Sequence, residues 1–138
     1  MQGKRVVLAG GCFDVLHPGH IIFLQKAKKA GDELIVLLES DEKVKKIKGI
    51  KRPVHNQKER ALMLKALKFV DAVILLPFME SEREYDEWVK KIKPDIIAAT
   101  LGDPQNHHKK RTAQLVGAKL KYVTKRVGNH SSSRILNH

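Results

Sequence analysis

The sequence is poor in cysteine and in aromatic residues, and it has no long hydrophobic run. Its one cysteine, Cys12, excludes an intramolecular disulfide and suits a reducing compartment. Aromatic residues make up only 5% of the chain, which leaves little surface for stacking on nucleic-acid bases. Apolar runs such as 72–79 are far shorter than the roughly 20 residues that cross a bilayer, and the N-terminal run lacks the length of a signal peptide. We therefore expect a cytoplasmic protein with no membrane-spanning segment.

The charge of the chain is strongly unbalanced. Lysine and arginine number 27 against 15 acidic residues, which gives a formal net charge of +12 in 138 residues. Many of the lysines fall in stretches with a helical pattern, such as 26–29, where a solvated helix face explains them. Attraction of a polyanion, either a nucleic acid or a nucleoside triphosphate, is the other interpretation. Charge alone does not choose between the two.

Short apolar runs alternate with amphipathic stretches from one end of the chain to the other. We expect strands at 5–9, 34–38, 72–76, 96–99 and 120–123, and helices at 19–30, 41–47, from Asn56 onward, 82–92 and 106–116. Uniformly apolar strands that alternate with helices are typical of parallel sheets covered on both faces. The pattern predicts an α/β fold: a Rossmann-like, doubly wound, parallel five-stranded sheet with helices on both faces, in one domain over 1–138. Ligands of such sheets bind beyond the carboxyl ends of the strands.

Local signals set the ends of two of these helices. Gly31 follows the helix at 19–30 and is placed to end it. Asn56 begins a later helix, and Glu59 three residues on completes a capping box. The apolar residues of that helix are expected to be buried roughly on one side: Ala61, Leu62, Leu64 and Leu67.

The segment after the first expected strand combines glycines with two histidines. Glycines such as Gly11 let a backbone approach a phosphate closely, and His17 and His20 lie one turn apart where a helix begins and an anion is favoured. The histidines could instead only cap the helix. They could also bind a metal, although no third ligand lies nearby in sequence. Cys12 has no neighbouring base and is interpreted as a small residue chosen for fit.

Residues 11–20 resemble the signature of the cytidylyltransferase-like nucleotidyltransferases, which has the form G-x-F-D-x-x-H-x-G-H. Every fixed position is present: Gly11, Phe13, Asp14, His17, Gly19 and His20. A second block resembles the adenylyltransferase domain of bacterial ADP-heptose synthase through Ser40, Asp41, Lys45, Lys48, Gly49, Arg52, Pro53, Val54, Glu59 and Arg60. Residues 128–135 resemble the closing motif of the family, with His130 in place of the usual isoleucine. The resemblance spans nearly the whole chain.

The resemblance implies a reaction and a role for particular residues. A substrate phosphate attacks the α-phosphorus of a nucleoside triphosphate and displaces pyrophosphate, so positioning and electrostatic stabilisation supply most of the rate. Catalytic roles fall to His17, His20 and Lys48. The nucleotide is expected to contact Gly11, Cys12, Phe13, His17, Gly19, His20, Asp103, Arg126, Ser131, Ser132 and Ser133. The acceptor is expected to contact Asp14, Lys45 and Arg60.

Several of these assignments have ordinary structural alternatives. Lys45 and Lys48 could belong to a lysine-rich surface, and Arg60 could form a surface ion pair. Asp103 could simply form a turn before a proline. The serines of the closing motif could be a helix N-cap. Mg²⁺ is expected to arrive with the triphosphate, bound largely through its phosphates, and no protein metal site is expected.

The acceptor and the base of the nucleotide stay open. The second block favours ATP and a sugar 1-phosphate, as in ADP-heptose synthesis. Archaeal FAD synthases share a run similar to 41–49 and a histidine before Ser-Ser, but they carry C-terminal cysteines that are missing here. Glycerol-3-phosphate cytidylyltransferase, which uses CTP, is a third relative. A basic nucleic-acid-binding module of Rossmann type is a different class, disfavoured by the few aromatic residues and by the lack of the K-M-S-K-S motif of class I aminoacyl-tRNA synthetases. The resemblance also implies a homodimer.

Overall fold

The computed structural model describes residues 3–126, so Ser131, Ser132 and Ser133 of the closing motif lie outside the described residues. The elements are β1 (Val6–Gly11), α1 (Pro18–Lys29), β2 (Glu33–Leu38), α2 (Asp41–Lys48), α3 (Gln57–Lys65), β3 (Ala72–Leu75), α4 (Glu82–Ile92), β4 (Ile96–Leu101), α5 (Asn106–Val116) and β5 (Lys119–Lys125). Each expected strand is present, and its ends lie within two residues of the expected ones. The helices expected at 82–92 and 106–116 have these bounds in the structure.

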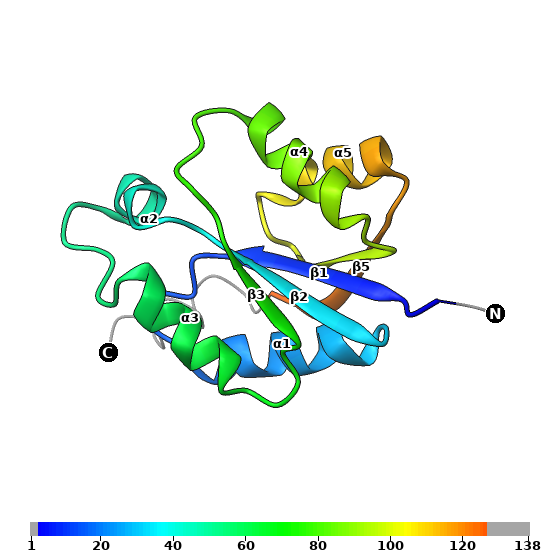
Figure 1. The fold of residues 1–138 in the computed structure, drawn as a ribbon, viewed down its shortest axis with the longest axis horizontal. Helices are drawn as coiled ribbons and strands as arrows, with labels where there is room; N and C mark the ends of the chain where they lie inside the picture. The colour runs from blue at the N-terminus through cyan, green and yellow to red at the C-terminus, as the bar shows by residue number, and fades with distance from the viewer. Residues whose placement is uncertain (1–2, 127–138) are drawn as a thin grey trace.

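The strands form one parallel sheet in the order β3-β2-β1-β4-β5. Helices α1 and α3 cover one face and α4 and α5 cover the other, as Figure 1 shows. The chain winds outward from β1 to β3, crosses back, and then winds outward again from β4 to β5. This arrangement confirms the doubly wound Rossmann-like fold and puts the topological switch point between β1 and β4.

Strands β1 and β4, which flank the switch point, are paired with each other over only part of their length. β1 pairs with β2 through six residues, from Val6 to Gly11. Its pairing with β4 consists of Val7 with Ile96 and Leu8 with Ile97. Within these described strands, the carboxyl-terminal halves of β1 and β4 are therefore not paired with each other. The strands at the switch point therefore separate toward the carboxyl edge of the sheet. The histidine segment follows directly after β1, on one side of this separation.

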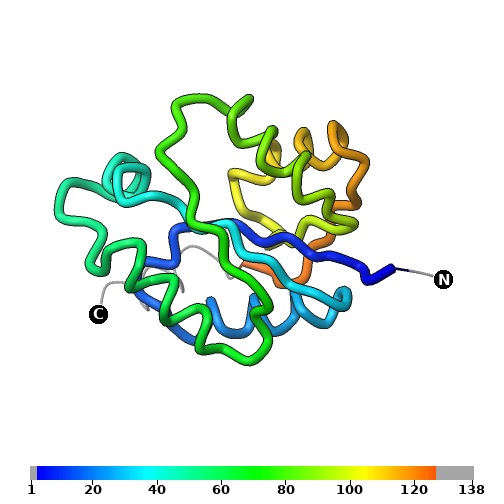
Figure 2. Tube along the Cα trace, viewed as in Figure 1, coloured from blue at the N-terminus to red at the C-terminus, as the bar shows by residue number. Residues whose placement is uncertain are grey.

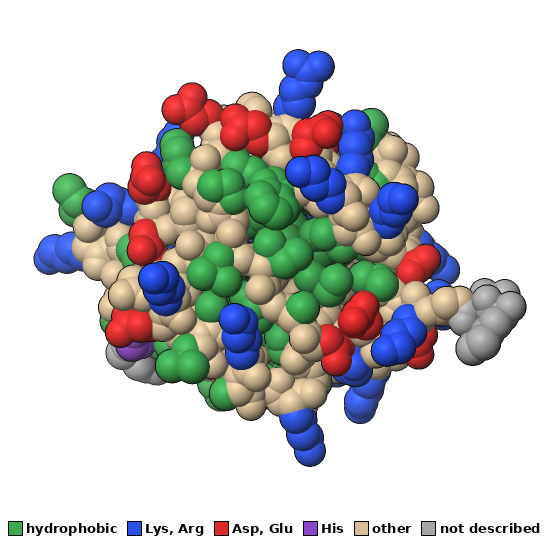
Figure 3. Space-filling model, viewed as in Figure 1, with side chains coloured by type: hydrophobic (Ala, Val, Ile, Leu, Met, Phe, Trp, Pro, Cys, Tyr) green, Lys and Arg blue, Asp and Glu red, His purple; other side chains and the backbone are tan. Residues whose placement is uncertain are grey.

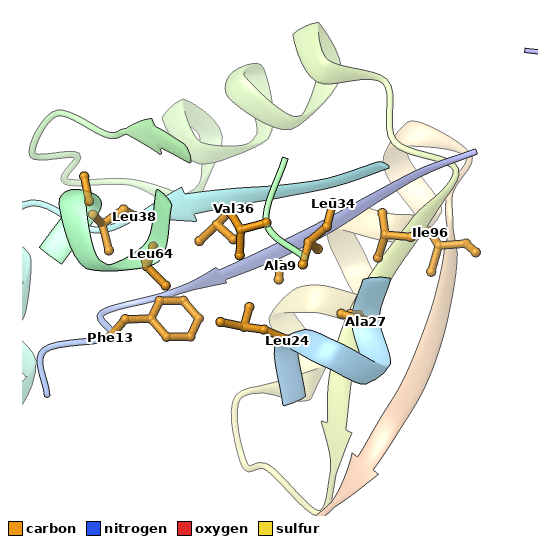
Figure 4. Packing of buried hydrophobic residues seen from close by; sticks show 13 residues of the cluster. Ala9, Phe13, Leu24, Ala27, Leu34, Val36, Leu38, Leu64 and Ile96 are labelled. Carbon is orange, nitrogen blue, oxygen red and sulfur yellow. The ribbon is translucent and has the colours of Figure 1, made fainter. Parts of the chain in front are cut away.

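Alternation along the strands separates two apolar cores. Val7 and Ala9 of β1 face α1 and α3, whereas Leu8 between them faces α4 and α5. The first core continues beyond the strand, because the ring of Phe13 lies beside Leu24 of α1 and Leu64 of α3 (Figure 4). The loop after β1 is thus anchored in the core by an aromatic ring.

Two expectations about local packing need correction. In α3, Leu62 is 71% exposed and Arg60 is fully buried, because the helix packs only the narrow stripe that carries Ala61 and Leu64. Gly31 does follow α1, but its φ is not in the left-handed region. A Cβ at Gly31 would lie 2.8 Å from the carbonyl oxygen of Arg5, so glycine is needed there for close packing against the start of β1. The expected capping box of Asn56 and Glu59 is present.

The carboxyl edge of the sheet carries the segments that follow the strands. The trace in Figure 2 shows α2 and the 49–56 loop extending beyond this edge, away from the two helical layers. On the face drawn in Figure 3, acidic side chains lie among the lysines and arginines, and hydrophobic side chains gather near the middle. The basic excess therefore does not form a patch of one sign on that face. Within residues 3–126, no helix is long and apolar enough to cross a membrane.

Two leucines of α3 provide a direct test of this packing. Leu64→Ala is expected to lower the free energy of unfolding by about 2–5 kcal/mol, because it opens a cavity between α3 and the sheet. Leu62→Ala, two residues away on the exposed side, should change it by no more than about 0.5 kcal/mol. Urea unfolding measures both. Equal losses in the two variants would contradict the orientation of α3.

Candidate active site

The two histidines of the signature form one structural unit at the start of α1. His17 is the N-cap, and its Nδ1 accepts a hydrogen bond from the N–H of Gly19 at 3.1 Å. The Nδ1 of His20 accepts from the N–H of His17 at 3.3 Å. The two rings stack with their centroids 3.8 Å apart and their planes 30° apart. Together the two bonds form a capping box made of imidazoles.

Capping uses only one nitrogen of each ring. A ring nitrogen that accepts a hydrogen bond carries no proton, so in the neutral form each imidazole bears its proton on Nε2. This leaves Nε2–H of His17 for a ligand, and also that of His20 apart from an interaction of its ring with the backbone of Val15, which acts to raise its pKa. The capping interpretation and the ligand-binding interpretation are compatible, because they concern different atoms of the same side chains.

The amide groups of the first turn are less free than the sequence suggested. Pro18 has no N–H, the N–H of Gly19 is bound by His17 Nδ1, and the N–H of His20 donates to the carbonyl of His17 at 2.9 Å. The amide groups of Gly19 and His20 are therefore already bonded within the protein, and Pro18 has none to offer. The groups that the two imidazoles could offer to a ligand in place of these amides are their Nε2–H groups.

Burial keeps His20 neutral over a wide pH range. Desolvation, the charge of His17 and the charge of Lys48 lower the pKa of His20 to about 4. The edge of the ring also meets Phe13, with the centroids 5.3 Å apart. At neutral pH His20 is thus a hydrogen-bond donor without a positive charge.

The loop that leads to the histidines depends on close contacts at its glycines. A Cβ on Gly11 would lie 2.9 Å from the ring of Phe13, and a Cβ on Gly19 would lie 2.9 Å from Cε1 of His17. Phe13 itself has a φ of 45°, in the left-handed region that costs a bulky residue about 1–3 kcal/mol. Burial of its ring, which is 6% exposed, offsets that cost. The expected nucleotide-binding residues Gly11, Cys12, Phe13 and Gly19 are therefore close to the histidines.

Asp14 is occupied within the protein. Its side chain accepts hydrogen bonds from the backbone N–H groups of Val54 and His55 and from Nε of Arg52, with which it forms an ion pair. Burial by itself would raise the pKa of Asp14, but these hydrogen bonds outweigh it and hold the pKa below its ordinary value. The expectation that Asp14 contacts the acceptor does not fit a carboxylate that is only 2% exposed. It ties the 49–56 loop to the signature loop.

Arg60 is occupied in the same way. Its guanidinium is fully buried and donates to the carbonyl oxygens of Cys12 at 2.7 Å, Glu39 at 2.9 Å and His55 at 3.0 Å. It also binds Oδ1 of Asp41 at 2.7 Å. Neither the expected acceptor contact nor the alternative of a surface ion pair describes this residue. Arg60 joins the segments that follow β1 and β2 to the start of α3.

The two expected lysines both lie on α2, and the charge of one of them affects pKa values in the site. Lys48 is exposed at the end of the helix, and its charge lowers the pKa of His20 and opposes the rise in the pKa of Cys12. Burial is the main cause of that rise, so the Cys12 thiol stays protonated at neutral pH. This agrees with its interpretation as a small residue chosen for fit. Lys45 is exposed one turn earlier in α2, and its role stays a prediction.

Asp103 and Arg126 lie at the carboxyl ends of β4 and β5, on the other side of the switch point. Oδ1 of Asp103 accepts from the N–H of Gln105 at 2.8 Å, and Oδ2 lies 3.9 Å from Nζ of Lys109. The N–H of Arg126 donates to the carbonyl of Leu101 at 2.8 Å, while its side chain is exposed. The turn role of Asp103 is thus present, and nucleotide contacts of both residues stay predictions.

Three residues that the sequence did not single out also lie near these strand ends. Glu39 follows β2, Tyr85 reaches over from α4 to Gly10, and Asn106 begins α5 with a buried Oδ1 that has no hydrogen-bond partner among the described residues. A charged residue directly after a uniformly apolar strand was the signal that could have identified Glu39. No sequence signal separates Tyr85 from an ordinary core tyrosine.

The described residues hold no group of three or more His, Cys, Asp or Glu side chains that could bind a metal ion. Two hollows in the surface lie away from the histidines. One, of about 210 Å³, is lined by Lys26, Lys29, Ala30, Lys121, Tyr122 and Val123. The other, of about 540 Å³, lies beside Pro94 and Gly117, at the opposite edge of the sheet from the signature. The site is therefore defined by the loops at the carboxyl edge.

The electrostatic account of His20 predicts its titration. By NMR, the His20 ring should titrate near pH 4, and Lys48→Gln should raise this pKa, because the charge of Lys48 helps to lower it. Lys45→Gln, on the same helix, is the matched control and should leave it unchanged. Since the unfolded chain binds the proton more tightly, stability contributed by the neutral ring is lost as the pH falls from 6.5 toward 4. A titration midpoint near 6.5 would contradict burial of the ring.

The hydrogen bonds of Arg60 predict a large effect on stability. Arg60→Met should lower the free energy of unfolding by about 3 kcal/mol or more, because three carbonyl oxygens lose their donor. Arg83→Met, at an exposed arginine of α4, is the control and should have little effect. Urea unfolding compares them. Similar stability of the two variants would mean that Arg60 does not hold the loops together.

Comparison with known proteins agrees with this geometry. A model of the cytidylyltransferase-like family matches residues 8–137. The chain is 50% identical over 96 residues to the bifunctional protein HldE of Campylobacter fetus, and 48% identical over 96 residues to that of a Nitratiruptor species. Each match covers 70% of this chain and 20% of the relative, so the chain spans about a fifth of the length of these curated relatives.

Solved structures give the same result. The crystal structure of the lipopolysaccharide core biosynthesis protein from Thermoplasma volcanium has a TM-score of 0.70 and 31% identity, covering 91% of this chain and 98% of that one. The pantoate-beta-alanine ligase from Francisella tularensis shares the fold, with a TM-score of 0.64 and 15% identity over 100% of this chain and 67% of its own. Since the matched residues include both the sheet and the histidine segment, the chain belongs to the cytidylyltransferase-like family.

Proposed function

We propose that this chain is an adenylyltransferase that transfers AMP from ATP to a sugar 1-phosphate and releases pyrophosphate. The observation that carries the proposal is the pair of stacked imidazoles at the switch point, each held through Nδ1 with Nε2–H left for a ligand. The similarity to the bifunctional HldE proteins supports ATP and a sugar phosphate as substrates, and so does the resemblance of the second block to the adenylyltransferase domain of ADP-heptose synthase.

The proposed reaction needs no general base. An oxygen of the acceptor phosphate, already an anion at neutral pH, forms a bond to the α-phosphorus, and the bond from that phosphorus to the bridging oxygen breaks. The electron pair leaves with pyrophosphate. The barrier comes from bringing two polyanions together, so fixed donors aimed at the phosphates are the effective device.

The roles of the residues follow from their positions. His17 and His20 donate Nε2–H groups to phosphate oxygens, and their orientation is fixed before the ligand arrives because Nδ1 is already bonded. Lys48 adds a positive charge on the side of α2. Arg126 and Asp103 are proposed to hold the nucleotide at the ends of β4 and β5, and Ser131, Ser132 and Ser133, outside the described residues, are also proposed to bind it. Lys45 is proposed to face the acceptor.

Mg²⁺ is proposed to enter with the triphosphate. The side-chain atoms beside the histidines that could contact a ligand are mainly nitrogen atoms, whereas Mg²⁺ prefers oxygen ligands. The Asp14 carboxylate is already bonded within the protein. These residues therefore fit a cation that is held chiefly by phosphate oxygens. When bound, Mg²⁺ would neutralise part of the phosphate charge.

Pyrophosphate release tests the function and selects the substrates. ATP and CTP are supplied separately with Mg²⁺, each with a heptose 1-phosphate, FMN or glycerol 3-phosphate. We expect release with ATP and the heptose 1-phosphate. Release with ATP and FMN, or with CTP and glycerol 3-phosphate, would identify an FAD synthase or a cytidylyltransferase in its place. No release with any pair, combined with no binding of either nucleotide, would contradict the enzyme assignment.

A variant of His17 separates catalysis from capping. His17→Asn keeps a side chain that can cap α1 but removes the Nε2–H donor, so turnover should fall by about 10²–10³ with little change in the melting temperature. His108→Gln, at an exposed histidine of α5, is the control and should keep full activity. A His17→Asn enzyme with normal turnover would remove His17 from the reaction.

A further inference from the structure

Glu39 extends β2 at the carboxyl edge of the sheet. Its N–H donates to the carbonyl of Gly11 at 3.1 Å, so the pairing of β2 with β1 continues one residue beyond the strand. Ile35 and Leu37, at the same phase of the alternation, pack on the side of α4 and α5. Glu39 therefore lies on the α4 side of the edge, at the opposite face from the core that anchors Phe13.

Tyr85 of α4 stands over the end of β1 on that same side. A Cβ on Gly10 would lie 2.9 Å from the hydroxyl of Tyr85, so this hydroxyl occupies the space that the glycine leaves free. Gly10 is paired with Leu37, two residues before Glu39. Burial and the negative charges of Glu39 and Asp86 raise the pKa of Tyr85. The charge of Glu39 also contributes to the raised pKa of Cys12, in the signature loop.

Neither polar group has a bonded partner within the part of the chain that the structure describes. Residues 3–126 contain no hydrogen bond or ion pair to the Glu39 carboxylate or to the Tyr85 hydroxyl. The guanidinium of Arg60 is near but binds the backbone carbonyl of Glu39 and the side chain of Asp41. Burial raises the pKa of Glu39, with Lys43 and Arg60 opposing. A half-buried carboxylate without a bonded partner is costly, and a ligand that hydrogen-bonds to it would offset that cost.

We propose that Glu39 and Tyr85 bind hydroxyl groups of the sugar part of the acceptor, on the α4 side of the carboxyl edge. This proposal rests on the proposed function. A carboxylate accepts hydrogen bonds from two neighbouring hydroxyls, and a phenol both donates and accepts, so the pair matches a polyol. The negative charge of Glu39 repels phosphate groups, whereas His17, His20 and Lys48 attract them. The site thereby distinguishes the hydroxyl end of a sugar phosphate from its phosphate end, and the phosphate is directed toward the histidines.

Binding of the acceptor alone tests this assignment without relying on turnover. Isothermal titration measures a heptose 1-phosphate and, as the probe without hydroxyls, inorganic phosphate. Glu39→Gln and Tyr85→Phe should each weaken binding of the heptose 1-phosphate by about tenfold, and neither should weaken that of inorganic phosphate. Glu33→Gln, at the opposite end of the same strand, is the matched control and should bind both ligands as the unchanged protein does. Melting temperatures verify that all three variants are folded.

The outcomes separate the two proposals. Binding of the heptose 1-phosphate that is equal in Glu39→Gln, Tyr85→Phe and the unchanged protein would overturn the hydroxyl-binding role, as would a lack of binding to the unchanged protein. Binding that depends on Glu39, in a protein that releases no pyrophosphate, would support this role while contradicting the proposed reaction. In an active enzyme, Glu39→Gln should raise KM for the sugar phosphate and leave KM for ATP unchanged. A rise in KM for ATP alone would also overturn it.

Discussion

The guanidinium of Arg60 is the interaction on which the arrangement of the site depends. It is buried at the carboxyl edge of the sheet and donates to the backbone of Cys12, Glu39 and His55, while it pairs with Asp41. One rigid fork of donors thus fixes the segments that follow β1 and β2 and the one that precedes α3. Asp14 repeats the device with opposite charge, because its carboxylate collects N–H groups from the 49–56 loop. Asp14 and Arg60, two charged residues near the histidines, therefore shape the loops of the site.

The imidazole pair caps α1 through one nitrogen of each ring, which is compatible with the proposed contacts of the other nitrogen to phosphate. Nδ1 of each ring closes the start of α1, and this fixes the direction of Nε2. Burial then keeps His20 neutral, so it donates a hydrogen bond without adding a charge. Positive charge comes instead from Lys48 on α2. A rigid neutral donor and a separate cation are a suitable combination where charge must be stabilised as it develops on phosphate oxygens.

The fold was predictable because its signals are local and repeated. Strand-helix alternation with uniformly apolar strands predicts a parallel sheet covered on both faces. The bounds of α4 and α5 follow from their periodicity, with Ser81 capping the start of α4 and Gly117 ending α5. The histidine segment was also predictable, since G-x-F-D-x-x-H-x-G-H combines glycines, which are needed here for close contacts, with a helix start. The burial of Arg60 was not, because an arginine near a helix N-terminus is ordinarily exposed. The exposure of Leu62 shows the same limit, since helical periodicity does not fix how wide a stripe the sheet covers.

Three properties could be predicted from the order of the residues alone: the parallel doubly wound sheet, the switch point after β1 and the placement of two histidines there. These properties depend on residues close together in the chain. Within residues 3–126, the choice of which charged side chains are bonded internally depends instead on how distant segments meet in the folded protein. Asp14 and Arg60 are bound by backbone groups up to 48 residues away. Glu39 and Tyr85 also come from distant segments, because the N–H of Glu39 bonds to Gly11 while the hydroxyl of Tyr85 lies beside Gly10. Hydrogen bonds between distant segments form only when the sheet brings its strand ends together, so which charged groups are bonded within the protein is a property of the fold.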